Sequence, residues 1–196
     1  MKRIFAAIDI SEEARARVAD YIKGLREDFS EIRVGWERTE KLHLTLKFFG
    51  EVNEEQLIKL TSAIEETAKQ FLDFKLQITE TGVFPSNRNA RVLWLGVRDE
   101  KGSLQKLNGI LESECEKNGF AREKRKFKAH LTIARLREPR KSIKLAKFHA
   151  ESEFLSKEFT VRELIIFQSQ LTALGSQYTP IFRAQFHKPD LPLTSI

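Results

Sequence analysis

Apolar residues alternate with polar ones, or recur every three or four positions, in separate segments of this chain. Residues 2–10 are mostly apolar and predict a strand, and Ser11 with the two glutamates after it predicts the start of a helix. Ile32, Val34 and Trp36 then alternate with polar residues. The chain is therefore expected to begin as strand, helix and strand.

The alternation is sharpest in the segment from residue 42 to residue 48. Every second residue here is large and apolar, and these residues are expected to face the core: Leu42, Leu44, Leu46 and Phe48. The residues between them are expected to share the opposite face: His43, Thr45 and Lys47. Gly50 is expected to end this strand, and Asn53 to cap a following helix.

The second half of the chain predicts a similar order of elements. Strands are expected at 74–80 and 91–98 around a loop at 82–87, and a helix over 103–117 should end at Gly119. In the next strand, at 128–135, His130 and Thr132 share the face opposite the apolar residues. Two further strands are expected, at 158–167 and 178–186, whereas 137–156 gives no clear pattern.

A strand, a helix and then a strand carrying His-x-Thr occur once in each half, which suggests an ancient duplication. We predict an α+β fold in which residues 1–196 form a single bilobal domain. Its two pseudo-symmetric lobes, each a mostly antiparallel sheet backed by helices, should face a central groove that carries one His-x-Thr strand from each lobe.

Composition excludes several classes of protein. Of the 196 residues, 41% are hydrophobic and 32% are charged, which is typical of a globular protein and of neither a disordered nor a membrane-embedded one. Asp9 interrupts the N-terminal apolar run before it could form a signal-peptide core, so a cytoplasmic location without membrane association is expected. The single cysteine, Cys115, excludes an intrachain disulfide.

Positive charge is concentrated in one segment. The net charge is +6, and eleven Lys and Arg residues lie between Arg122 and Lys147, against two glutamates. Such a segment is expected in a protein that binds a polyanion, nucleic acid above all. A solvated, lysine-rich surface explains it equally well when the charge is considered alone.

The two His-x-Thr strands are the most informative feature. With four His and eleven Thr, chance predicts roughly 0.2 such pairs, yet two occur, at His43 with Thr45 and at His130 with Thr132. Two imidazoles can act as general acid and general base on opposite sides of a phosphorus atom. Each threonine hydroxyl can donate to a phosphate oxygen. A metal site is less favoured, because carboxylate and thiolate partners are missing from the motif.

Three segments together resemble the 2H phosphoesterases, and among them the RNA 2′,3′-cyclic phosphodiesterases first named 2′-5′ RNA ligases. The resemblance covers most of the chain and rests on these segments: His43-Leu44-Thr45-Leu46 with Lys47-Phe48-Phe49-Gly50, Gly82-Val83-Phe84-Pro85 leading into Arg91-Val92-Leu93-Trp94-Leu95-Gly96, and His130-Leu131-Thr132-Ile133-Ala134-Arg135. It implies a bilobal fold, no metal or other cofactor, and hydrolysis of the cyclic phosphate to a terminal 2′-phosphate. RNA with a cyclic phosphate end, tRNA fragments included, would be the partner, and a monomer is expected.

The resemblance also implies residue roles. His43 would be the proton donor and His130 the proton acceptor, an assignment that the residues themselves leave open. Thr45 and Thr132 match the threonines that hold phosphate. We add Arg135 as a phosphate-binding residue because it follows the second motif, although strict alternation places it on the apolar side.

Two other functions compete with hydrolysis. The same acid and base could join RNA ends through a 2′-5′ linkage, the reverse reaction. Water is abundant and no nucleotide-activation motif such as a P-loop is evident, so hydrolysis is favoured. A non-catalytic RNA-binding module would explain the basic segment but gives no reason for two matched His-x-Thr strands.

Overall fold

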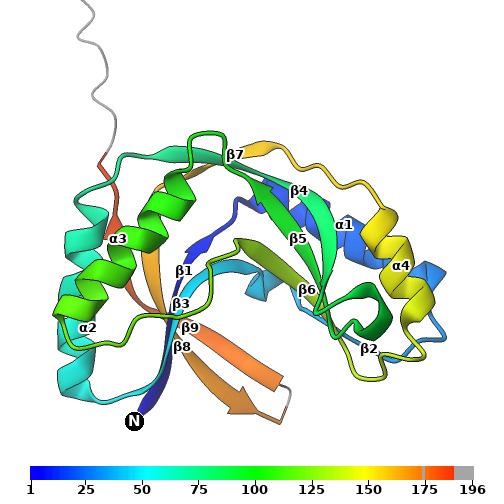
Figure 1. The fold of residues 1–196 in the computed structure, drawn as a ribbon, viewed down its shortest axis with the longest axis horizontal. Coiled ribbons are helices and arrows are strands. Elements are labelled where there is room, and N and C mark those ends of the chain that lie inside the picture. The colour runs from blue at the N-terminus through cyan, green and yellow to red at the C-terminus, as the bar shows by residue number, and fades with distance from the viewer. Residues whose placement is uncertain (174, 188–196) are drawn as a thin grey trace, which may run out of the picture.

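Two antiparallel sheets and four helices make up the part of the chain that the computed structural model describes, residues 1–173 and 175–187 (Figure 1). The first sheet has the order β3-β1-β8-β9, from strands His43–Val52, Lys2–Asp9, Glu163–Thr172 and Gly175–Gln185. The second has the order β2-β6-β5-β4-β7, from strands Val34–Trp36, His130–Leu136, Val92–Arg98, Phe74–Phe84 and Glu158–Val161. The α+β fold with two antiparallel, helix-backed sheets is confirmed.

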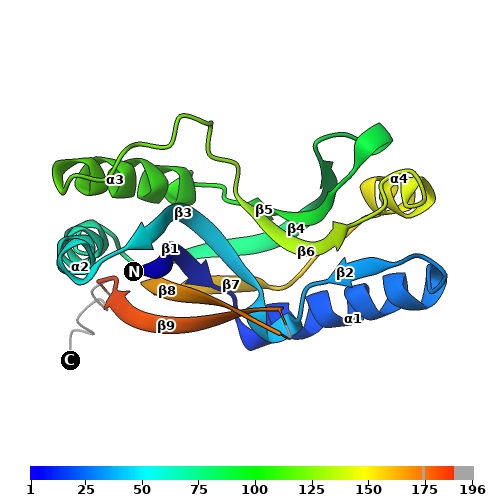
Figure 2. The same cartoon turned by 90° about the horizontal axis from the view of Figure 1, so that it is seen from below.

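The helices lie in two pairs at opposite ends of the molecule (Figures 1 and 2). One pair is α2 (Glu54–Ala68) with α3 (Ser103–Lys117), and the other is α1 (Glu12–Asp28) with α4 (Ile143–Glu151). None of these helices is long and apolar enough to cross a membrane. A single cluster of buried apolar side chains reaches both sheets, from Ile4 and Leu44 in the first to Leu95 and Leu131 in the second. The two sheets therefore share one core.

The predicted helix ends are confirmed by their hydrogen bonds. Ser11 caps α1 by accepting the Ala14 N–H at 3.2 Å. Asn53 and Gln56 form a capping box at α2, in which each side chain accepts the backbone N–H of the other residue. The α3 helix has the predicted bounds, and Gly119 beyond it has the positive φ of 86° that a glycine tolerates best.

Three strand boundaries were predicted wrongly. Gly50 does not end its strand, because β3 continues to Val52 with the glycine at a φ of 73°. The loop expected at 82–87 begins only after Phe84, since β4 pairs with β5 as far as that residue. The strand expected at 158–167 is two strands that part at Arg162, because β7 pairs with β4 in one sheet and β8 with β1 in the other. The segment without a clear pattern contains α4.

His149, which has no threonine two positions after it, joins three elements of the core. It is fully buried on α4, and its Nε2–H points at the carbonyl oxygens of Gly82 and Trp94 at 3.1 and 3.0 Å. A carbonyl only accepts, so Nδ1 is the acceptor for the Tyr21 hydroxyl of α1, 2.9 Å away. This histidine therefore holds α1 and α4 against the sheet that carries His130.

Candidate active site

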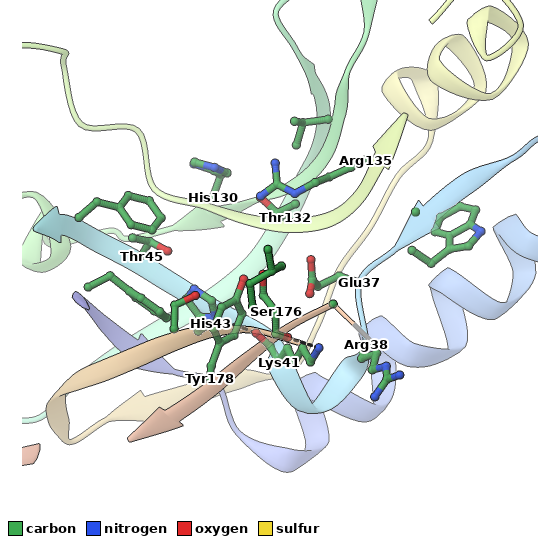
Figure 3. A pocket seen from close by; sticks show the side chains of 18 of the residues that line it. Glu37, Arg38, Lys41, His43, Thr45, His130, Thr132, Arg135, Ser176 and Tyr178 are labelled. Atoms are coloured by element: carbon green, nitrogen blue, oxygen red, sulfur yellow. Dashed lines mark hydrogen bonds between the residues drawn. The ribbon is translucent and has the colours of Figure 1, made fainter. Parts of the chain in front are cut away.

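All five predicted site residues line one groove of about 740 Å³ between the two sheets (Figure 3). They are His43 and Thr45 on β3, and His130, Thr132 and Arg135 on β6. Each sheet contributes one His-x-Thr strand, and the histidine and threonine of each strand point from it into the groove. The structure thus brings together residues that are almost ninety positions apart.

The two strands share a matched irregularity directly after the threonine. In β3 the pairing with β1 skips Leu46, and in β6 the pairing with β5 skips Ile133, so each strand contains one extra residue there. Beginning at the histidine, the first six residues of both strands have the same burial sequence, ending in two buried residues and one exposed residue. Each bulge therefore reverses the alternation of the side chains that follow it.

The bulge in β3 overturns the prediction for Lys47 and Phe48. Phe48 was expected in the core but is 68% exposed and lines the groove, whereas Lys47 is only 5% exposed. The Lys47 ammonium donates to the Glu112 carboxylate at 2.6 Å and to the Ala121 carbonyl at 2.8 Å. Lys47 thus connects β3 to α3 and to Ala121, the residue just before the basic segment.

The bulge in β6 places Arg135 in the groove. Strict alternation assigned this side chain to the apolar side, and that expectation is wrong because Ile133 and Ala134 are both buried in succession. Arg135 consequently faces the groove beside Thr132, at the same step after its histidine as Phe48 after His43. One side of the groove therefore has an aromatic ring where the other has a cation.

The two imidazoles are oriented in the same way. His43 donates from Nδ1 to the Lys41 carbonyl at 2.7 Å, and His130 donates from Nδ1 to the Lys128 carbonyl at 2.8 Å. Because a carbonyl oxygen only accepts, Nδ1 carries the proton in both rings. The Nε2 atom of each ring is left free to accept or donate a proton.

Burial lowers the pKa of both histidines below its ordinary value. For His43 the hydrogen bond to Lys41 and the charge of Asp9 oppose the effect, while Arg15 and His130 add to it. For His130 the hydrogen bond to Lys128 opposes it, and the charges of Lys128 and Arg135 add to it. Aromatic rings supply part of this burial. Phe5 and Tyr178 lie 4.8 and 5.2 Å from the His43 ring, and Phe84 lies 5.1 Å from the His130 ring.

The sequence model described as LigT-like phosphoesterase matches the chain twice in succession, over residues 8–94 and 95–177. The chain belongs to the LigT-like phosphoesterase family. The tandem match agrees with the internal duplication that the two His-x-Thr strands suggest. No group of three or more His, Cys, Asp or Glu side chains that could hold a metal ion occurs among the residues described for this LigT-like phosphoesterase.

Similar proteins cover nearly the whole chain. A protein of Archaeoglobus fulgidus named RNA 2′,3′-cyclic phosphodiesterase is 36% identical over 180 residues, which cover 90% of this chain and 96% of that protein. One with the same name from Methanothermobacter thermautotrophicus is 34% identical over 181 residues, 90% of this chain and 95% of that one. The structure of Escherichia coli LigT complexed with 3′-AMP superposes with a TM-score of 0.74 at 26% identity, covering 94% and 98% of the two chains.

Several charged residues that line the groove of this LigT-like phosphoesterase were not predicted from the sequence. Its cations include Arg3, Arg38 and Lys41 in addition to Arg135 and Arg137, and the carboxylate of Glu37 also lines it. Glu37, Arg38 and Lys41 lie in the connection between β2 and β3, and Arg3 lies on β1. No motif marks these residues. Lys41 also donates to the Ser176 carbonyl on β9, which links the segment before His43 to the other edge of the groove (Figure 3).

Of the eleven Lys and Arg residues of the basic segment, all of which the structure describes, only Arg135 and Arg137 line the groove. Other members pair with nearby glutamates, as Arg122 does with Glu116 and Arg125 with Glu123. Three of the five cations that line the groove, Arg3, Arg38 and Lys41, therefore lie outside the basic segment.

Proposed function

We propose that this protein hydrolyses 2′,3′-cyclic phosphodiester ends of RNA to a terminal 2′-phosphate, with His43 and His130 as a general acid and base pair. The observation that carries the proposal is the pair of equally oriented imidazoles that face one groove from two sheets. The names of the relatives agree with this substrate class.

Hydrolysis needs one proton removed and one proton delivered. His130 Nε2 takes a proton from the attacking water as its oxygen bonds to phosphorus. The bond from phosphorus to the ribose 3′-oxygen breaks on the opposite side, and His43 Nε2–H gives that oxygen its proton. The phosphate remains on the 2′-oxygen, and the next turnover requires the two imidazoles to exchange their protonation states through water.

The neighbouring side chains would hold the charge of the phosphate during this step. Thr45 and Thr132 each lie two residues from their histidine on the same strand face, so each hydroxyl can donate to a non-bridging oxygen. Arg135 adds a positive charge beside Thr132. The remaining groove cations would bind the RNA backbone.

A single assay tests the reaction. The protein is incubated in excess EDTA with a cyclic-ended RNA and a 5′-hydroxyl RNA, and opened and joined products are separated. Opened RNA with a 2′-phosphate is expected. Joined RNA as the main product would favour ligation, and activity that appears only after zinc or magnesium is added would contradict the two-histidine mechanism.

A further inference from the structure

Glu37 is the only carboxylate among the described residues that line the groove. It directly follows β2, and its backbone N–H donates to the Ile133 carbonyl at 2.9 Å, so it is fixed beside the bulge of β6. Its side chain points into the groove toward Arg135 (Figure 3). The strand that carries His130 therefore also sets the place of this carboxylate.

A carboxylate at this point works against phosphate binding. Five Lys and Arg residues make the groove attractive to phosphate, and one negative charge among them repels it. Burial raises the pKa of Glu37, and the charges of Arg135 and Lys41 oppose that rise. The carboxylate nevertheless makes no hydrogen bond or ion pair with any described residue. Partly buried acceptors of this kind need donors, which here must come from a ligand or from water.

The chemistry of the proposed substrate restricts which donors are available. In a 2′,3′-cyclic phosphate both ring hydroxyls of the terminal ribose are esterified, so the N–H groups of the base are the donors that this nucleoside retains. Guanine presents two adjacent donors, N1–H and the N2 amino group, on its Watson–Crick edge. Two adjacent donors match the two oxygens of a carboxylate.

We propose that Glu37 is a specificity-determining residue that accepts hydrogen bonds from the Watson–Crick edge of a guanine in the terminal nucleoside. This inference rests on the proposed function and names the base that the same groove prefers. Tyr178 offers a ring for the face of that base. It lines the same groove as Glu37 and packs next to His43, with 5.2 Å between the two ring centroids.

Mononucleoside substrates test base recognition alone, because they contain no preceding ribose whose 2′-hydroxyl could donate to Glu37. The wild-type protein and Glu37→Gln are compared on guanosine and inosine 2′,3′-cyclic phosphates, which differ only in the N2 amino group. Wild-type kcat/KM should favour the guanosine substrate over the inosine substrate about tenfold. Glu37→Gln should abolish this preference, because the glutamine side chain has only one acceptor oxygen and its NH₂ group would face a donor of the base. Glu40→Gln is the matched control, because Glu40 is exposed and does not line the groove.

Equal kcat/KM for guanosine and inosine in the wild type, or a preference that survives in Glu37→Gln, would overturn the inference. So would an effect confined to RNA substrates that disappears when the preceding ribose lacks its 2′-hydroxyl, because Glu37 would then bind that hydroxyl. Calorimetric binding of guanosine and inosine 2′-monophosphates separates this inference from the proposed function. A binding preference without hydrolysis would contradict the function alone, and hydrolysis without a preference would contradict the inference alone.

Discussion

Each groove histidine is oriented by the carbonyl of the residue two positions before it, Lys41 for His43 and Lys128 for His130. This contact is local in sequence and is made at the first residue of the strand in both β3 and β6. It fixes the tautomer without any third side chain, in contrast to sites where a carboxylate orients the imidazole. Removing a ring should therefore affect the chemistry much more than the fold.

Replacing either histidine by alanine tests the pair directly. His43→Ala and His130→Ala should each lower kcat by about 10²- to 10⁴-fold, since general acid or base catalysis typically contributes that much. The double variant should lose less than the product of the two effects, because one proton transfer accelerates little without the other. His187→Ala, outside the groove, is the control. Near-wild-type kcat in either single variant would contradict the mechanism.

The lowered pKa values of the two histidines predict the pH dependence. The reaction needs one imidazole protonated and one neutral, so kcat/KM should be bell-shaped. Burial lowers both pKa values below 6.5, so protonation of the base on acidification and deprotonation of the acid on alkalinisation both occur below that pH. Both limbs of kcat/KM measured against pH are expected below 6.5. The alkaline limb of the kcat profile should lie at higher pH than that of kcat/KM, because bound phosphate favours the imidazolium form of the acid. An alkaline limb of kcat/KM well above pH 6.5 would contradict the expectation.

At the scale of single elements, the site depends on features that alternation could reveal only in part. The faces of His43, Thr45, His130 and Thr132 followed from a period of two, because these residues precede each bulge. A bulge requires no particular residue type, so Lys47 and Phe48 were assigned to the wrong faces. In β6 the successive apolar residues Ile133 and Ala134 did signal the reversal. Reading that signal would have placed Arg135 in the groove.

The strands behind His130 contain a tightly packed layer that can be tested separately. A Cβ atom on Gly82 would lie 2.1 Å from the Trp94 ring, and Trp94 packs against Phe84 at 5.2 Å. Gly82→Ala should therefore lower the free energy of unfolding by about 1–3 kcal/mol and reduce activity through Phe84. In α3, a Cβ atom on Gly109 would meet no atom within 4 Å. Gly109→Ala should therefore raise the free energy of unfolding by about 0.5–1 kcal/mol. Urea unfolding measures both changes, and equal effects would contradict this packing.

At the scale of the whole molecule, the sequence indicated two facing sheets but could not show how the chain passes between them. The three residues of β2 lie in the first half, yet they pair with β6 about a hundred positions later. Similarly, β8 from the second half pairs with β1. Pairings over such distances depend on the complete tertiary structure, which local patterns do not record. The groove cations Arg3, Arg38 and Lys41 were missed for the same reason.

RNA affinity should follow the charges that line the groove. Changing Arg38 and Arg137 to alanine should raise KM for an oligoribonucleotide. The negative slope of log kcat/KM against log salt should become shallower by about 0.7 for each phosphate that the variant no longer binds. Small cyclic nucleotides should be affected much less. Lys124→Ala with Lys126→Ala is the matched pair, because these basic-segment lysines do not line the groove. A larger effect from the lysines would show that RNA extends from the groove across the basic segment.

The exchange of strands between the two halves has a consequence for dividing the protein. A cut at Gly102, between β5 and α3, would leave β1–β5 on one fragment and β6–β9 on the other. Neither fragment could complete a sheet, because β8 and β9 extend the first sheet and β6 separates β2 from β5 in the second. The fragments would also carry one groove histidine each. Fused to two interacting proteins, they would form a split reporter whose signal requires both pieces to assemble.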